Sequence, residues 1–391
     1  MRPDRVSVCL PWSGTRVADM QNEQSEILIV GGSLAGLTFA LACARRGMPV
    51  RIIERSLGHL RGGDSLTVDL NILKAVVGFD PRSAPALQVV PAYRDLTTWS
   101  ALYGWLRDRA ADTPGIIIEQ GRSVALVADD HEQPTVTLDD GNIRTGRAVI
   151  GADGYRSMIR RVISPEAPFA QYAGYLVWRG LVDERLLSRP VAWPSDGGLW
   201  IDFIGGYRLV AATLPGQDGS LEPGKRQITF AWFDSHQEAL LRDTGCLTED
   251  GSIVGTLARG MIDPAVREAL LAKVHSVWPP TWAEAVKKGI TVNNVLSGAP
   301  IAEYRPERLA RGRLAVIGDA AHVVSPMTGR GYLTGVEDAE ILGQSLADTQ
   351  HFRDVPAALA NYESARLPYV RGLVAHSIRI SGDFRQYAAR A

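Results

Sequence analysis

The sequence predicts an α/β fold in which both ends of the chain build one parallel sheet and a mixed β-sheet lobe is inserted between them. Three observations predict it: a strand–helix–strand unit in residues 26–54, an aromatic-rich lobe from 172 to 297, and a buried strand near residue 314 that is followed by helices. A length of 391 residues suits such a two-domain arrangement.

The first unit begins with a short apolar strand, Ile27–Val30, which stops at two glycines. Residues 34–46 carry Ala and Leu at helical spacing, and Gly47 ends this helix as a C-cap. A second, β-branched strand follows at Pro49–Glu54, so that the whole is a βαβ unit of about 30 residues, the usual size. Residues 1–24 precede it, and we expect them to be a flexible extension.

The pattern then changes twice. Residues 116–148 hold short strands between polar turns (GIIIEQ, SVALVAD and PTVTLDD), which predict an antiparallel meander. Ala148–Ile150 returns to a buried strand. From 172 to 297, strands rich in aromatic residues alternate with loops rich in Gly and Pro, and this lobe is expected to carry a pocket.

A further buried strand lies at Leu314–Ile317, and helices are predicted over Val336–Leu346 and much of Pro356–Arg385. Elements typical of a nucleotide-binding domain therefore occur at both ends of the chain. We expect residues 25–171 and 298–391 to form one discontinuous domain, with 172–297 as a separate substrate-binding lobe.

Composition excludes several classes of protein. Lys and Arg total 42 against 43 for Asp and Glu, so there is no basic excess that would indicate nucleic acid. The 3 cysteines lie far apart, which favours a reduced cytoplasmic protein over a disulfide framework or a metal site. No apolar run predicts a membrane span. The oligomeric state stays open, a homodimer included.

The turn after the first strand reads Gly31-Gly-Ser-Leu-Ala-Gly36. This is a GxGxxG pattern with Ser33 at the second glycine position, and it opens a helix whose free N–H groups suit a pyrophosphate. Glu54 closes the next strand, where an acidic side chain accepts hydrogen bonds from ribose hydroxyls. The sequence thus predicts a dinucleotide held by the residues of this turn and by the end of the second strand: Gly31, Ser33, Leu34, Ala35, Gly36, Glu54 and Arg55.

Two later segments resemble motifs of one known family. Residues 151–160 (GADGYRSMIR) resemble the DGxxSxxR motif of the single-component, class A FAD-dependent aromatic hydroxylases. Residues 312–322 (GRLAVIGDAAH), continuing through 326–331, resemble the GD motif of the same family. The segment 172–180 (YAGYLVWRG) is most similar to the 2,6-dihydroxypyridine 3-hydroxylase branch.

The resemblance implies tightly bound FAD and a Rossmann-like domain of the glutathione-reductase and p-hydroxybenzoate-hydroxylase type. It implies that Asp319 accepts bonds from ribityl hydroxyls, that Pro326 lines the flavin face, and that backbone N–H groups near Gly331 stabilise the reduced flavin. The remaining cofactor-binding candidates implied in the same way are Asp153, Gly329, Tyr332 and Leu333.

The implied reaction is the hydroxylation of a small hydroxylated aromatic or N-heteroaromatic ring, dihydroxypyridine-like, through a flavin C4a-hydroperoxide. NAD(P)H would serve as a transient co-substrate with O₂. The alternatives are a protein of the same fold that catalyses epoxidation, Baeyer–Villiger oxidation or oxidative rearrangement, and a non-catalytic FAD-binding protein. The sequence does not name the ring or choose between NADH and NADPH.

The lobe offers candidates for the substrate site. Substrate-binding candidates are the aromatic residues Tyr175, Trp178, Phe203 and Trp232, and catalytic candidates are His236, Tyr207 and Arg179. The loop Arg61–Leu66 is expected on the other edge of the flavin. Ordinary sheet packing is the alternative for each aromatic residue, and an ion pair is the alternative for Arg179.

Four further positions keep two interpretations each. Asp153 and Arg160 would contact the cofactors, or would hold their own loop as a helix cap or an internal salt bridge. His322 is more typical of a structural residue than of a catalytic one. Arg330 would approach the flavin or point to solvent.

Overall fold

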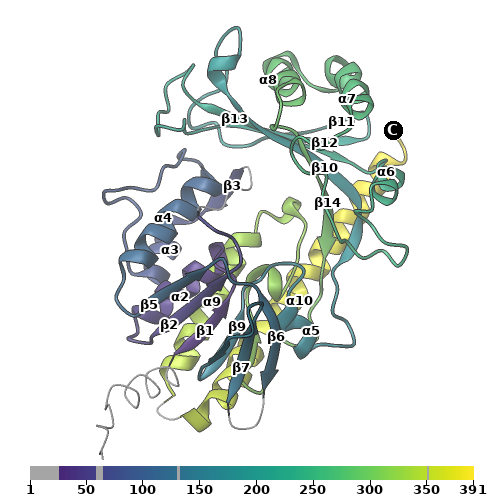
Figure 1. The fold of residues 1–391 in the computed structure, drawn as a ribbon. Helices are drawn as coiled ribbons and strands as arrows, with labels where there is room; N and C mark the ends of the chain where they lie inside the picture. The colour runs from purple at the N-terminus through teal and green to yellow at the C-terminus, as the bar shows by residue number, and fades with distance from the viewer. Residues whose placement is uncertain (1–25, 59–64, 130–132, 350–351) are drawn as a thin grey trace, which may run out of the picture.

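The computed structural model describes residues 26–58, 65–129, 133–349 and 352–391, and it places two sheets one above the other (Figure 1). The expected extension at 1–24 and most of the loop 61–66 lie outside the described residues. The lower sheet has the order β15-β16-β9-β1-β2-β5. Its strands are β1 Ile27–Val30, β2 Val50–Glu54, β5 Ile116–Gln120, β9 Ala148–Gly151, β15 Ala310–Arg311 and β16 Leu314–Val316.

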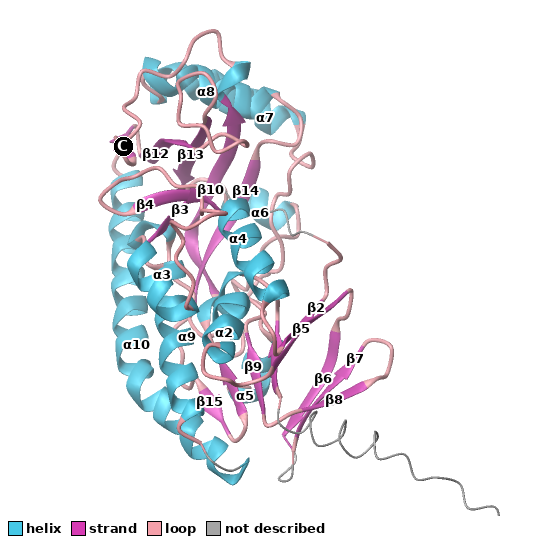
Figure 2. Cartoon of the chain, turned by 90° about the vertical axis from the view of Figure 1, so that its left-hand side faces the viewer, coloured by secondary structure: helices cyan, strands magenta, loops and turns pink. Residues whose placement is uncertain are grey.

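This sheet is parallel except at β15, and its strands come from both ends of the chain, as the sequence predicted. Helices cover one of its faces, and a small antiparallel sheet lies on the other side (Figure 2). The helices are α2 Leu34–Ala44, α3 Leu70–Val77, α4 Trp99–Asp112 and α9 Gly331–Ala347. Strands buried on both faces explain the continuous apolar runs, since every residue of β1 and β9 is buried.

The predicted meander is wrong in its first strand. Residues of β5 pair in parallel with β2, Ile116 opposite Val50, and so belong to the large sheet. Helix α4 lies between the two in sequence and supplies the crossover that a parallel pair needs. The small antiparallel sheet contains only the three strands β6 Val124–Asp129, β7 Pro134–Leu138 and β8 Ile143–Thr145.

The upper sheet has the order β11-β12-β13-β10-β14 and is antiparallel throughout. Its strands are β10 Gln171–Asp183, β11 Trp200–Ile204, β12 Tyr207–Leu214, β13 Gln227–Asp234 and β14 Ser297–Glu303. The expected lobe boundaries, 172 and 297, fall next to the start of β10 and at the start of β14. Helices α7 Pro264–Val277 and α8 Pro280–Thr291 cover its upper face (Figure 1).

Helix α10, Val355–Ala388, connects the two halves. Its 34 residues span about 50 Å at the helical rise, and it contacts β15 of the lower sheet as well as β10 and β14 of the upper one. A ribbon of β3 Ser65–Val68 and β4 Asp95–Thr98 bridges the halves on another side. The remaining short elements are α5 Met158–Ile163, α6 Glu238–Asp243 and the 3₁₀ turns η1 Glu184–Leu186, η2 Gly318–Ala320, η3 Pro326–Thr328 and η4 Phe352–Asp354.

The buried apolar residues form separate clusters in the two halves of the molecule. One core cluster surrounds the parallel sheet, and a second fills the space between the antiparallel sheet and α7 and α8. In the described part of the chain, no helix has both the length and the apolar character needed to cross a membrane.

Candidate functional site

A cleft of about 720 Å³ lies where segments far apart in the sequence meet at the carboxyl ends of β1, β2 and β9. The turn at residue 31, the end of β2, the loop after β9 and the start of α9 all line it. Its lining from these segments includes Gly31, Ser33, Leu34, Ala35, Glu54, Arg55, Asp153, Asp319, Pro326, Gly331 and Tyr332. Most of the predicted cofactor-binding residues therefore surround one cavity, although Gly36, Gly329 and Leu333 are not part of this lining.

The glycines of the first turn are required by close backbone contacts. Gly31 has φ +105°, and a Cβ there would lie 2.4 Å from the carbonyl oxygen of Ala152. A Cβ on Gly36 would lie 2.0 Å from the carbonyl oxygen of Gly31. The side chain of Ser33, which precedes α2, makes no capping bond. The first N–H groups of α2 are thus left to bind an anion in the cleft.

Glu54 holds the turn from the end of β2. Its Oε2 accepts the N–H of Gly32 at 2.8 Å, and its Oε1 accepts the N–H of Ser56 at 2.8 Å. A carboxylate has about four acceptor sites, so both oxygens keep capacity for ribose hydroxyls. Arg55 beside it is exposed at the same end of the cleft.

Asp153 and Arg160 hold the loop after β9. Asp153 accepts the N–H of Met158 at 2.6 Å at the start of α5, and burial raises the pKa of its carboxyl group. Arg160 is 1% exposed and donates to the backbone carbonyls of Asp319 (3.3 Å) and Ala320 (3.1 Å). The geometry favours the capping interpretation for Asp153. Arg160 therefore joins the DGxxSxxR segment, residues 151–160, to the GD segment, residues 312–322.

Asp319 presents a carboxylate to the cleft. Its side chain is exposed there, and it has no hydrogen-bond partner among the described residues. Partial desolvation by the walls of the cleft raises the pKa of Asp319, although the nearby His322 and Arg160 act in the opposite direction. An accessible carboxylate whose acceptor sites are empty suits a ligand that carries several hydroxyl groups.

A buried ionic cluster around Asp338 holds the residues on either side of Asp319. The carboxylate of Asp338 accepts hydrogen bonds from Nε2 of His322 at 2.7 Å, from the N–H of Gly318 at 3.0 Å and from Nε of Arg366 at 2.8 Å. Burial disfavours the charged carboxylate, but His322 and Arg366 outweigh it, so that the pKa of Asp338 is lowered. His322 is 1% exposed and lies behind the cleft as a structural residue. No sequence pattern pointed to Arg366, which lies far along the chain on α10.

The start of α9 is joined to the start of α2. The hydroxyl groups of Tyr332 and Thr38 lie 3.2 Å apart, and Thr38 donates to the carbonyl of Leu34 at 2.7 Å. No side chain caps α9 at Arg330. Two helix N-termini, each with a positive end of its dipole, therefore face the same cleft from adjacent elements.

Two arginines fix the backbone next to this helix. Arg330 donates to Oε1 of Glu337 at 3.0 Å and also bonds the hydroxyl of Tyr369, so its side chain follows α9 toward α10 and neither enters the cleft nor ends in solvent. Arg94 donates to the carbonyl of Gly329 at 3.0 Å. Arg94 therefore holds the turn that carries Pro326, and Arg330 joins the start of α9 to α10.

The two faces of the upper sheet divide the predicted substrate and catalytic residues. Trp178, Trp232 and Tyr207 lie on the face that α7 and α8 cover, where Tyr207 meets the ring of Trp232 at 5.3 Å. His236 follows β13 on this side, with Nδ1 3.2 Å from Oδ1 of Asp234 and its ring 6.1 Å from Tyr207. The structure does not bring these four residues to the cleft, and the geometry gives their predicted roles no support.

The other face turns toward the cleft and carries Tyr175, Arg179 and Phe203. The hydroxyl of Tyr175 donates to Oγ of Ser325 at 2.6 Å, next to Pro326. Arg179 is half-buried on β10, next to the edge strand β14, and Phe203 is exposed on the opposite edge strand β11, with its ring 5.4 Å from Tyr387. Sequence patterns missed Ser325, because a single serine before Pro326 carries no distinctive signal.

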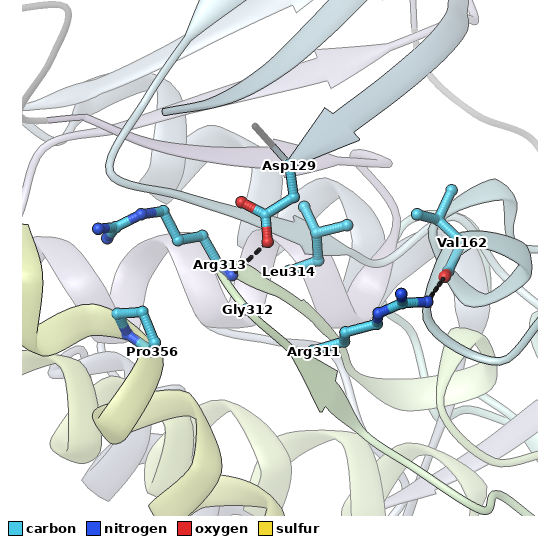
Figure 3. A pocket seen from close by; sticks show the side chains of 7 residues that line it. All are labelled: Asp129, Val162, Arg311, Gly312, Arg313, Leu314 and Pro356. Atoms are coloured by element: carbon cyan, nitrogen blue, oxygen red, sulfur yellow. Dashed lines mark hydrogen bonds between the residues drawn. The ribbon is translucent and has the colours of Figure 1, made fainter. Parts of the chain in front are cut away.

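A second cavity lies at the opposite ends of the strands (Figure 3). There Asp129 accepts the N–H of Arg313 at 2.9 Å, and Arg311 donates to the carbonyl of Val162 at 3.3 Å. Gly312 has φ +58°, and a Cβ there would lie 1.9 Å from Oδ2 of Asp129. These contacts explain the local backbone, and none of the predicted site residues lies in this cavity.

Comparisons with known proteins agree with this geometry. Residues 172–293 match a family described as FAD binding domain-like, and residues 287–377 match a family described as FAD binding domain. A FAD-dependent urate hydroxylase of Klebsiella pneumoniae is 28% identical over 389 residues, covering 89% of this chain and 87% of that protein. The aurachin C monooxygenase/isomerase of Stigmatella aurantiaca is 27% identical over 382 residues, covering 90% and 88%.

A solved structure supports the fold. The 2,6-dihydroxypyridine-3-hydroxylase of Arthrobacter nicotinovorans superposes with a TM-score of 0.76 at 21% identity, covering 93% of each chain. This is the branch that the sequence resembled.

The described residues fit FAD. The glycine turn approaches its own backbone too closely for any side chain, as a pyrophosphate cradle requires, and two uncapped helix N-termini face the cleft. Asp319 and Glu54 offer acceptor oxygens for ribityl and ribose hydroxyls, respectively. The volume of the cleft accommodates an extended cofactor.

Proposed function

We propose that this chain, which belongs to the FAD-dependent aromatic-ring monooxygenases, hydroxylates an aromatic or N-heteroaromatic ring held between Pro326 and the lower face of the antiparallel sheet. The observation that carries the proposal is the convergence of three motifs on one cleft whose Pro326 end lies beneath that face. A reduced nicotinamide dinucleotide and O₂ are the co-substrates, and the substrate is a small molecule.

Bound FAD, once reduced, supplies an activated oxygen atom from O₂ for transfer to the ring. The N-terminus of α9 places positive dipole charge at Gly331, which stabilises negative charge on the reduced cofactor. Asp319 and the first turn of α2 fix the cofactor along the cleft. Arg160 keeps the loops on both sides of the cleft in register.

The remaining roles belong to the sheet face. Tyr175 and Ser325 hold Pro326 at a constant distance from β10, which excludes water and positions the ring for reaction. Arg179 reaches the same face and would pair with a phenolate or another anionic group of the substrate. An electron-rich ring becomes more nucleophilic when its hydroxyl group loses a proton, and a neighbouring cation favours that loss.

The test is a panel of ring compounds scored by substrate-stimulated NAD(P)H consumption and by the mass of the product. The proposal predicts a substrate that accelerates NAD(P)H oxidation and gains one oxygen atom. An enzyme that binds FAD but shows no stimulated oxidation with any ring compound would contradict it. Asp319→Asn serves as the control, because weaker FAD binding should reduce stimulated and unstimulated oxidation together.

A second candidate is oxidation followed by rearrangement of a ring system. The relative named aurachin C monooxygenase/isomerase favours it, since that protein spans most of this chain. Nuclear magnetic resonance of the product separates the two: an intact ring with one new hydroxyl group supports hydroxylation, and a migrated substituent supports rearrangement.

A further inference from the structure

The cofactor-facing side of the antiparallel sheet carries one continuous row of side chains across four strands. Strand register places Ile201 opposite Val210, Val210 opposite Ala231, and Ala231 opposite Arg179. We call these four residues the open row. Neighbouring strands are about 4.8 Å apart, so the row extends about 14 Å from β11 to β10.

The rows on either side are covered by other elements except at the sheet edge, where Phe203, opposite Arg208, is 48% exposed. Toward α10, Arg208, Phe233 and Val177 are 9%, 2% and 4% exposed, and the ring of Phe384 packs 6.2 Å from that of Phe233. Toward the β3–β4 ribbon, Ala212 is fully buried against Val90 and Leu96.

In contrast, every member of the open row keeps some exposure: Ile201 is 46% exposed, and the other three are half-buried. The open row, together with Phe203 at the sheet edge, is therefore the part of this face that neighbouring elements leave accessible.

The open row lies beside the cleft. Val210 and Ala231 pack against the same apolar cluster as Met327, which follows Pro326. Leu66 of β3 lines the cleft, and its partner strand β4 contacts the next row of the sheet. The accessible band thus lies between the elements that flank the Pro326 end of the cleft.

The open row is apolar along most of its length and cationic at one end. Ile201, Val210 and Ala231 are aliphatic, and Arg179 at the end of the row carries a guanidinium group. A small ring that carries polar groups on several sides would place them against Val210 and Ala231, where desolvated polar groups without partners are costly. An apolar body gains free energy along this band by burial, and one anionic or hydrogen-bond-accepting group at its end would meet Arg179.

We infer that the substrate is an extended, largely apolar aromatic compound, bicyclic or carrying an apolar substituent, with a single anionic or acceptor group that pairs with Arg179. This rests on the proposed function, since it assigns the substrate class of the same site. It departs from the small dihydroxypyridine-like ring that the resemblance implied.

Isothermal titration calorimetry on the oxidised FAD-loaded enzyme tests binding without turnover. The probes are 1-hydroxy-2-naphthoate (bicyclic and anionic), 2-naphthol (bicyclic and neutral) and 2,6-dihydroxypyridine (one polar ring). We expect the naphthoate to bind at least about tenfold more tightly than the pyridine. Tighter binding of the pyridine, or failure of the naphthoate to bind, overturns the inference.

Two variants locate the contacts. Arg179→Gln should weaken naphthoate binding about ten- to hundredfold and 2-naphthol binding less than about threefold. Ile201→Asp should weaken both bicyclic ligands about tenfold. Ile143→Asp is the matched control, because Ile143 is a 60% exposed isoleucine on the edge strand of the small sheet, away from the cleft.

Equal effects of the two aspartate variants, or equal loss of both ligands in Arg179→Gln, overturn the assignment of the row. The result of these binding measurements is independent of the test of the proposed reaction. An enzyme that binds the naphthoate as expected, yet never yields an oxygenated product with any ring, retains the inference about the ligand and contradicts the proposed reaction.

Discussion

At the scale of single residues, Asp319 has the chemistry most directly matched to the cofactor. Asp319→Ala removes an acceptor that faces the cleft without a protein partner, so the fold should lose little stability. FAD affinity should fall about ten- to hundredfold, the magnitude of losing hydrogen bonds to a charged group. Fluorescence titration of the apoprotein with FAD measures this, and unchanged affinity would place the ribityl chain elsewhere.

The same carboxylate predicts a pH dependence. Its pKa is raised because the walls of the cleft partly desolvate the carboxylate, so protonation begins at a higher pH than for an ordinary aspartate, whose pKa is about 3.9. The protonated form is a weaker acceptor, and FAD affinity should therefore decline as the pH falls toward the raised pKa. In Asp319→Asn this decline should disappear. A wild-type affinity that stays constant over the mildly acidic range would contradict the assignment.

Gly31 and Gly47 form a matched pair for the glycine turn. Both have positive φ, +105° and +72°, but a Cβ on Gly47 meets nothing within 4 Å, whereas one on Gly31 meets the Ala152 carbonyl. Gly47→Ala should cost about 1 kcal/mol of unfolding free energy through its backbone conformation alone. Gly31→Ala should cost more and also lose FAD, as chemical denaturation and flavin absorbance would measure. Equal losses would mean that the turn tolerates a side chain.

At the scale of elements, sequence patterns predicted those whose chemistry is local. The β1–α2–β2 unit, strand β9 and helix α10 have continuous apolar runs, helical spacing or recognisable turns, and the structure confirms them. Strand β5 was misplaced because three isoleucines predict a strand but do not say which neighbour it pairs with.

Which face of the upper sheet turns toward the cleft also depends on the tertiary structure. Alternation along β10 and β13 predicts two faces, but only the tertiary structure shows that Trp178 and Trp232 pack under α7 and α8 while Tyr175 and Arg179 face the cleft.

The ionic cluster behind η2 shows how one element depends on another. Asp338→Asn leaves the buried guanidinium of Arg366 without its ion pair to this residue and should cost about 3 kcal/mol of unfolding free energy. Glu238→Gln removes an exposed helical pair with Arg242 and should cost less than about 0.5 kcal/mol. Urea denaturation compares the two, and similar losses would refute the structural importance of the cluster.

The sign of the pH effect follows from the lowered pKa of Asp338. A carboxylate whose pKa is lower in the folded state contributes stability above its unfolded pKa of about 3.9, and this contribution is lost as the pH falls through the lowered folded-state value. The difference in stability between the wild type and Asp338→Asn should therefore shrink in acid.

At the scale of the whole molecule, a buried hydrogen-bond network joins the two halves. Oε1 of Glu303 on β14 accepts the hydroxyls of Ser377 (2.5 Å) and Ser381 (2.9 Å) on α10. Ser377 in turn accepts the N–H of Ser325 at 2.7 Å, and Ser325 accepts the hydroxyl of Tyr175. The turn that lines the cleft is thus bonded to the sheet and to the long helix at once, so ordering of that turn by FAD should be transmitted to β10.

Hydrogen exchange measured with and without FAD tests this coupling. In the wild type, FAD should increase the protection of amides in β10 and β14 as well as those of the cleft, because ligand binding to the folded state suppresses openings that expose both. In the double variant Tyr175→Phe and Ser377→Ala, FAD should still protect the β1–α2 turn, but the added protection of β10 should fall several-fold. The β1–α2 turn is the internal control, since none of the substituted groups contacts it. Equal FAD-dependent protection of β10 in both proteins would mean that apolar packing of Phe384 against Tyr175 and Phe233, and not the hydrogen-bond network, couples the halves.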